Sequence, residues 1–475
     1  MRRLPPELAD AARTSTHPAE VAVALESGGI NDRVAHLRYA TPDVFTLADA
    51  AVRDARDLPR AEPEADPPPV HAGIGASRWF AARGPLYAVP ALIALALLPA
   101  GDQVESALLL GGLALSWALG YGVTSMAWSY VGALDLPAAR RFLRRAILAG
   151  TAGSTLVAVV AVFGSLIWTT TMQVTLWTVA LLVGQTVYLL SAAALLMTGH
   201  EARLAIALVP AAAGAVLGAL DGRIAAPLTG PGQTAHGPEV IWLAVSVVLA
   251  FGLAMVATRG GARPRQPLPR VIVGNAGLQV VYGLMVSMLV LHPALFELTV
   301  LNYESLPLSV TLAALPLVLG MGVAEILLRD HRRRSARLLE AAHSTAEFAR
   351  AMRRELLAAH LKFAGSLLAM TVVLGALGAL LFGLDDARYV LLGLDYALLG
   401  TAIFGAMVLN LLGRIETVLL TCGIAAAVLV AVHVVADRTV SDLTAIIWQT
   451  GVAAVLLVAH SVLVHRQAAL PVAHR

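Results

Sequence analysis

Long apolar runs recur through most of the chain, starting near residue 84, and they constrain its fold more than any other feature. A helix needs about 20 apolar residues to cross the hydrocarbon of a bilayer. A membrane β-barrel would instead alternate apolar and polar residues in segments of about 10 residues. Charged residues make up 14% of the 475 residues, whereas a soluble chain carries about 25%. We therefore expect an all-α integral membrane protein.

The apolar runs predict about twelve transmembrane helices. Only Arg414 and Glu416 separate the tenth span from the eleventh. The first 70 residues contain no apolar run long enough for a signal peptide, so the first span is expected to direct insertion. The predicted spans are 84–100, 105–128, 146–168, 174–197, 203–220, 239–257, 271–291, 308–328, 363–384, 389–412, 415–436 and 442–464.

Residues 1–57 predict a small cytoplasmic helical module. Helical spacing appears in 17–27 and is followed by a glycine pair, and Asn31 can cap a second short helix. Thr41, followed by a proline and an aspartate, is expected to cap a third helix. A linker at 58–83 follows, and its first part is rich in proline and acidic residues.

Basic residues in the loops predict the orientation. With the N-terminus in the cytoplasm, 21 Arg and Lys side chains after residue 83 fall on the inner side and 3 on the outer side. Positive charge near helix ends resists translocation, so both termini are expected inside. Two cytoplasmic basic segments stand out, with the arginines Arg140, Arg141, Arg144 and Arg145 in the first and Arg332, Arg333, Arg334, Arg353 and Arg354 in the second.

The spans divide into two sets of six with similar connections. A basic segment follows the second helix of each set, at 135–145 and 329–360, and a Gly-containing turn follows the fourth, at 198–203 and 412–416. Two halves in the same orientation are typical of transporters. The predicted domains are a six-helix lobe at 84–258, a linker at 259–270, a second six-helix lobe at 271–466 and a tail at 467–475.

The longer basic segment, 329–360, has two interpretations. Its apolar and basic residues could form a helix that lies on the membrane surface. The flanking membrane helices could equally continue into the cytoplasm.

Polar residues within the spans are candidates for a substrate path, because burying them in lipid is costly. The alternative interpretation is that these residues hydrogen-bond to neighbouring helices, and each such bond stabilises a membrane protein by about 0.6 kcal/mol on average. The candidates are Trp117, Tyr121, Ser125, Gln185, Asn275, Gln279, Tyr282 and Asn410.

Signatures of catalysis are missing from the sequence. It contains no phosphate-binding loop, no H-E-x-x-H and no G-x-S-x-G. The lone Cys422 excludes an intrachain disulfide and a cysteine metal cluster. We expect no catalytic residue, no metal, no cofactor and no nucleic-acid partner. Glu297 and Asp395 are counted with the outside loops, and no strongly charged residue is placed at the bilayer midplane, so no proton relay is expected.

The segment SYVGALDLPAARRFLRRAILAG at 129–150 and the matched loops resemble polysaccharide flippases of the multidrug/oligosaccharidyl-lipid/polysaccharide exporter superfamily. The stretch 320–415, with its LLGRIE, is similar to the Pel exopolysaccharide export membrane proteins, and 24–50 looks like a leader on their bacterial relatives. The resemblance implies a two-lobed, V-shaped transporter in a bacterial inner membrane. It would move a polysaccharide or lipid-linked glycan outward, contacting membrane lipid and working beside a separate glycosyltransferase.

Three other functions stay open. The chain could be a membrane glycosyltransferase that uses an outside carboxylate such as Asp102 or Glu105, although its first outside loop is short. It could export small molecules or drugs. It could also be a scaffold that recruits a polysaccharide synthase through residues 1–57.

Overall fold

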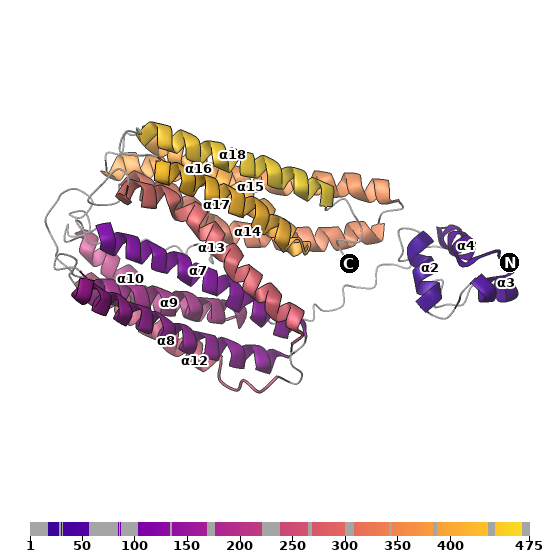
Figure 1. Cartoon of the computed structure of the whole chain (residues 1–475), viewed down its shortest axis with the longest axis horizontal. Coiled ribbons are helices and arrows are strands. Elements are labelled where there is room, and N and C mark those ends of the chain that lie inside the picture. Colours follow the sequence, from indigo (N-terminus) through magenta and orange to yellow (C-terminus); the bar gives the residue numbers. More distant parts are fainter. Residues whose placement is uncertain are drawn as a thin grey trace. The chain divides into compact units, whose positions relative to one another are not determined.

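The computed structural model describes residues 18–27, 30, 32–56, 84, 86, 103–133, 135–168, 176–220, 238–264, 268–299, 308–341, 344–382, 387–435 and 442–467. Within these ranges every regular element is an α-helix, as the sequence predicts (Figure 1). The helices are α2 (Pro18–Ser27), α3 (Asp32–Tyr39), α4 (Val44–Arg56), α7 (Gln103–Gly132), α8 (Leu136–Trp168), α9 (Leu176–Met197), α10 (Glu201–Leu220), α12 (Pro238–Ala257), α13 (Arg270–Thr299), α14 (Leu308–Ala341), α15 (Thr345–Phe382), α16 (Ala387–Leu411), α17 (Ile415–Val435) and α18 (Asp442–Gln467).

Nine helices in the described part of the chain are long and apolar enough to cross a membrane. These helices indicate a multi-pass membrane protein. They are α7, α8, α9 and α13 through α18; α10 and α12 coincide with predicted spans but are not among the nine. The first predicted span, 84–100, lies outside the described residues except for Gly84 and Leu86.

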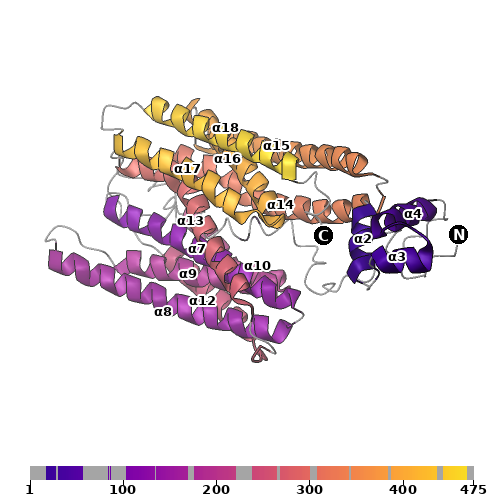
Figure 2. The same cartoon turned by 45° about the vertical axis from the view of Figure 1, so that its right-hand side comes forward.

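Helices α2, α3 and α4 share a small apolar core of their own (Figure 2). The third helix begins later than the sequence suggests. Asp43, not Thr41, caps it, because the backbone N–H of Thr46 donates to Asp43 Oδ1 over 2.6 Å. This bond and one from the Thr46 side chain hold the pKa of Asp43 below its ordinary value. The Thr41 hydroxyl instead donates to the carbonyl of Ala35.

The two turns that the sequence matches have the same backbone structure. After α9, Gly199 has φ +74° and the N–H of His200 donates to the carbonyl of Leu195 over 2.8 Å. After α16, Gly413 has φ +73° and the N–H of Arg414 donates to Leu409 over 2.9 Å. Both ends are Schellman motifs, which need a residue with positive φ. The second motif separates α16 from α17, so these two spans are distinct helices.

Helices α7, α8, α9, α10 and α12 pack against one another, and α13 packs against α7 and α17. The first five of these helices share one apolar core, which contains Leu143, Ile147, Leu195, Leu204 and Ala254. This core lies where α7, α9 and α12 end and α8 and α10 begin.

The basic segment 329–360 is the continuation of α14 and α15 and not a separate surface helix. α14 runs unbroken to Ala341 and α15 starts at Thr345, where the Ser344 hydroxyl accepts a bond from the N–H of Glu347. Arg334 and Glu355 join the two extensions through an ion pair of 2.8 Å. The chain divides into two compact units at almost the same residues, one containing 1–72, 328–359 and 463–475 and the other 73–327 and 360–462.

Candidate functional site

Two of the aromatic path candidates, Tyr121 and Tyr282, meet where α7 crosses α13. The rings of Tyr121 and Tyr282 are 5.3 Å apart in an edge-to-face arrangement, and Tyr282 is fully buried. Gly283 makes this approach possible, because a Cβ there would lie 2.8 Å from the Cα of Ala118. The two tyrosines therefore form part of a close helix crossing.

Two amide candidates hydrogen-bond each other. The Gln279 amide donates to Asn410 Oδ1 over 2.7 Å, and the Asn410 amide donates to Gln279 Oε1 over 3.0 Å. This pair ties α13 to α16. Gln185 lies elsewhere and donates to the carbonyl of Leu109 over 3.2 Å. These amides have the geometry of contacts between helices.

The remaining candidates do not join them. Asn275 is exposed on α13, and Trp117 and Ser125 are half-buried on α7. Of the carboxylates considered for catalysis, Asp102 lies outside the described residues and Glu105 lies in the first turn of α7. The structure thus does not gather the eight residues around one space.

An apolar cavity of about 1100 Å³ lies between α7, α8 and α9. Its lining on α7 extends from Leu108 to Val123, about 22 Å of helix at 1.5 Å per residue. Two lining side chains, Leu115 and Val157, are 46% and 50% exposed, so the cavity is open at the surface of the bundle. An elongated, open and apolar space suits a hydrocarbon chain.

Glycines create this space. A Cβ at Gly112 or Gly150 would collide with Leu182 or Leu190, so these two glycines let α9 approach α7 and α8. A Cβ at Gly111 or Gly153 would meet no atom of the described residues within 4 Å, so these two leave the cavity empty.

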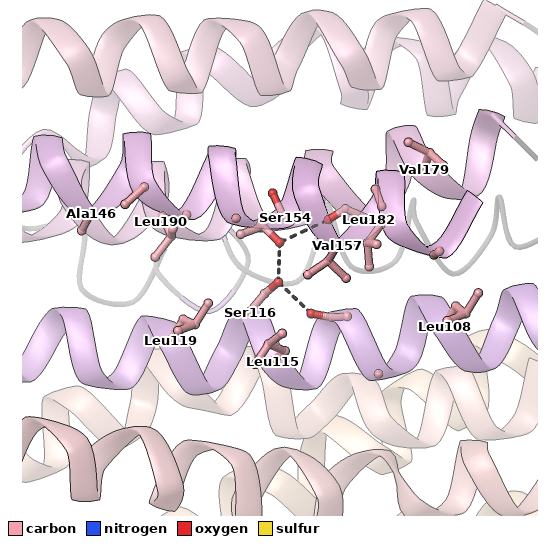
Figure 3. A pocket seen from close by; sticks show the side chains of 18 of the residues that line it. Leu108, Leu115, Ser116, Leu119, Ala146, Ser154, Val157, Val179, Leu182 and Leu190 are labelled. Carbon is pink, nitrogen blue, oxygen red and sulfur yellow. Dashed lines mark hydrogen bonds between the residues drawn. The ribbon is translucent and has the colours of Figure 1, made fainter. Parts of the chain in front are cut away.

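The polar side chains of the cavity are few and mostly paired. The Ser116 hydroxyl on α7 lies 2.7 Å from that of Thr186 on α9, and Ser116 also donates to the carbonyl of Gly112. Figure 3 shows Ser116 and Leu119 facing Leu182 and Leu190 across the space. None of these cavity residues is among the sequence candidates. The sequence signal that could have identified this cavity is a pair of glycines in each of two successive spans, Gly111 with Gly112 and Gly150 with Gly153.

No family model, curated protein or solved structure matches the chain. The site must therefore be interpreted from its own geometry.

Ionisable side chains lie inside the helices where the sequence interpretation placed outside loops. Glu297 belongs to α13 and is 3% exposed, and Asp395 belongs to α16 and is 2% exposed. Counting them with the loops was wrong, because α13 continues to Thr299 and Asp395 lies within α16, which covers most of the predicted span 389–412. Arg388 on α16 forms an ion pair with Glu297.

The basic residues of the first basic segment lie on α8, which runs continuously from Leu136 and is capped by Asp135. Arg140, Arg144 and Arg145 are exposed, and Arg141 is half-buried. Partial burial, followed by the charges of Arg203 and Arg140, lowers the pKa of His200 below its ordinary value. The turn after α9 and the start of α8 therefore form one basic region.

In the second segment, Arg332, Arg333, Arg353 and Arg354 are exposed, and Arg334 is paired with Glu355. Their side chains give the extensions of α14 and α15 a basic surface. Such a surface is typical of segments at an anionic cytoplasmic leaflet.

Proposed function

We propose that the protein is a membrane transporter that moves a polysaccharide or lipid-linked glycan outward by alternating access. The single observation that carries this proposal is the apolar cavity between α7, α8 and α9. Sugars need many polar partners, whereas this cavity offers Ser116, Ser154, Thr178 and Thr186 among mainly apolar side chains. The cavity therefore favours the lipid-linked form of the substrate, with the hydrocarbon chain in the cavity.

The architecture that we propose for this function has twelve spans in two six-helix lobes, with both termini inside. The matched Schellman turns at Gly199 and Gly413 support the repeat. The basic extensions of α14 and α15 support the orientation, since arginines concentrate on cytoplasmic segments. We propose that the chain moves its substrate without making or breaking a bond, beside a separate glycosyltransferase in a bacterial inner membrane.

Filling the cavity tests the proposal. We expect Gly111→Leu and Gly153→Leu to reduce export about tenfold, equivalent to about 1.4 kcal/mol of lost binding, because the new side chains occupy the space of the lipid chain. The measurement is secreted polysaccharide, together with lipid-linked sugar trapped inside, in a deletion strain that carries each variant.

Gly252→Leu is the matched control. Gly252 is an exposed helix glycine on α12 that does not line the cavity, and a Cβ at this position would meet no atom of the described residues within 4 Å. We expect this variant to export normally. Normal export by all three variants, or by the deletion strain itself, contradicts the proposal.

A second candidate function is export of apolar small molecules, since pockets for such ligands typically measure about 300–1,000 Å³ and this cavity is of similar size. Unchanged polysaccharide with altered drug tolerance in the deletion strain would favour this alternative.

A further inference from the structure

A buried polar cluster joins α13, α17 and α18 at the end of the bundle where α13 and α17 end and α18 begins. His292 on α13 is 6% exposed, and Gln449 on α18 is 5% exposed. Both lie within helices that can cross a membrane. Ionisable groups in such segments are costly, and they commonly mark ion or proton pathways.

The hydrogen-bond partners of His292 fit a neutral ring in the arrangement shown. Nε2 lies 3.2 Å from the carbonyl oxygen of Leu429, which can only accept, so Nε2 carries a hydrogen. Nδ1 lies 3.0 Å from the Gln449 amide nitrogen, which can only donate, so Nδ1 accepts. The arrangement corresponds to a neutral ring.

The same partners can hold a protonated ring. The Gln449 carbonyl oxygen, Oε1, is buried and has no hydrogen-bond partner among the described residues. Rotating the amide by half a turn would bring Oε1 to Nδ1, where it could accept a bond from a newly added hydrogen. A glutamine can therefore satisfy both states of the histidine without a change in the positions of the helices.

Other titratable and charged groups lie on α13 itself and on the neighbouring helices α16 and α17. His433 on α17 lies 5.8 Å away, ring centre to ring centre. Glu297 follows on α13 and pairs with Arg388 of α16, while its Oε2 has no partner among the described residues. Also on α16, Asp395 precedes Tyr396, whose hydroxyl donates to the carbonyl of Val290. Two imidazolium charges would repel at this separation, so we assign one proton to the histidine pair.

We propose that His292 and Gln449 form a proton-binding site through which the protein couples substrate movement to proton flow. This rests on the proposed transport function. A proton from water on one side adds to Nδ1, the ring carries one positive charge, and the same proton later leaves to water on the other side. An O–H bond of a hydronium ion breaks as this N–H bond forms, and an O–H bond to water on the other side forms as it breaks. In the proposed orientation the cluster lies at the outer end, so protons enter from outside as the substrate is exported.

The test uses the purified full chain in lipid vesicles and measures amide hydrogen exchange in peptides that cover α17 and α18. The measurement runs from about pH 5.5 to about pH 8, because histidine changes charge in this range. After correction for intrinsic rates, we expect protection in the wild type to change with pH. His292→Gln should remove this pH dependence. Gln449→Glu should shift it, because a carboxylate at Nδ1 favours the protonated ring.

His460→Gln is the matched control, because His460 is a fully buried histidine of α18 that bonds Thr421 and the carbonyl of Ala402. It should keep the pH dependence. Wild-type exchange that is independent of pH overturns the proton site. So does pH dependence that survives His292→Gln, that Gln449→Glu leaves unshifted, or that is lost equally in His460→Gln.

Export in the deletion strain separates this failure from failure of the transport function. We expect a proton uncoupler to stop wild-type export and His292→Gln to reduce export at least tenfold. Export that continues with the uncoupler overturns the coupling alone, whereas unchanged export on deletion of the gene overturns the transport function.

Discussion

At the scale of single residues, the amides of Gln279 and Asn410 tie α13 to α16 through two hydrogen bonds. Their polarity within predicted spans made them candidates for a substrate path, and the sequence could not distinguish this role from contact between helices. Because each amide is the other's donor and acceptor, neither is fully available to a sugar. Removing one partner leaves the other unsatisfied, whereas removing both costs less.

This reciprocity gives the residue-scale prediction. We expect Gln279→Leu and Asn410→Leu each to lower the free energy of unfolding by about 0.6 kcal/mol, and the double variant to lose less than the sum. Unfolding in mixed micelles, analysed as a double-mutant cycle, measures the difference. Asn275→Leu, at an exposed position on α13, is the control. Additive losses of unfolding free energy, or loss of export in a stable double variant, would instead indicate that both residues line the substrate path.

At the scale of elements, close helix packing depends on glycines whose roles differ from position to position. Gly283 brings α13 against the backbone of α7, and Gly375 lies against Tyr389. By contrast, Gly274 on α13 has no described atom within 4 Å of a Cβ. Without a hydrophobic force between helices in lipid, such small residues decide where helices meet.

The element-scale prediction compares two glycines of α13. Gly283→Leu should destabilise the protein by about 1–3 kcal/mol, as overpacking does, because its side chain would press on Ala118 and Tyr121. Gly274→Leu should be neutral or stabilise by up to about 1 kcal/mol through higher helix propensity. Thermal unfolding in detergent measures both. Equal effects would show that the α7–α13 crossing is not closely packed in the membrane.

At the scale of the whole molecule, the proposed orientation places the α14–α15 extensions inside and the connection before α16 outside. A single-cysteine strategy is straightforward, because Cys422 is the one cysteine of the sequence and is buried. Labelling with a membrane-impermeant thiol reagent then reports which side each position faces.

The topology prediction uses Ser344→Cys, just before α15, and Asp386→Cys, just before α16. In intact cells stripped of their outer membrane, we expect Asp386→Cys to react and Ser344→Cys to react only after permeabilisation. The wild type is the control and should not react. The opposite pattern would show that the protein has the reverse orientation in the membrane. Labelling of both positions from the same side would contradict the number of spans between them.

The sequence by itself determined the helical membrane class, eleven of the predicted spans as helices and the two matched turns. Apolar length, Gly199 and Gly413 act locally, through the cost of exposing backbone to lipid and the need for positive φ. The third helix of the N-terminal module was also predicted, although its cap at Asp43 was not, because Thr41 and Asp43 are both suitable cap residues.

Only the tertiary structure decided which residues face one another. It paired Gln279 with Asn410, left a cavity beside Gly111 and Gly153, and buried Glu297 and His292 among residues from other helices. Polar residues in a span have the same sequence pattern whether they line a path or bond a neighbouring helix. The distinction depends on helix rotation and crossing, which are set by contacts between residues far apart in the chain.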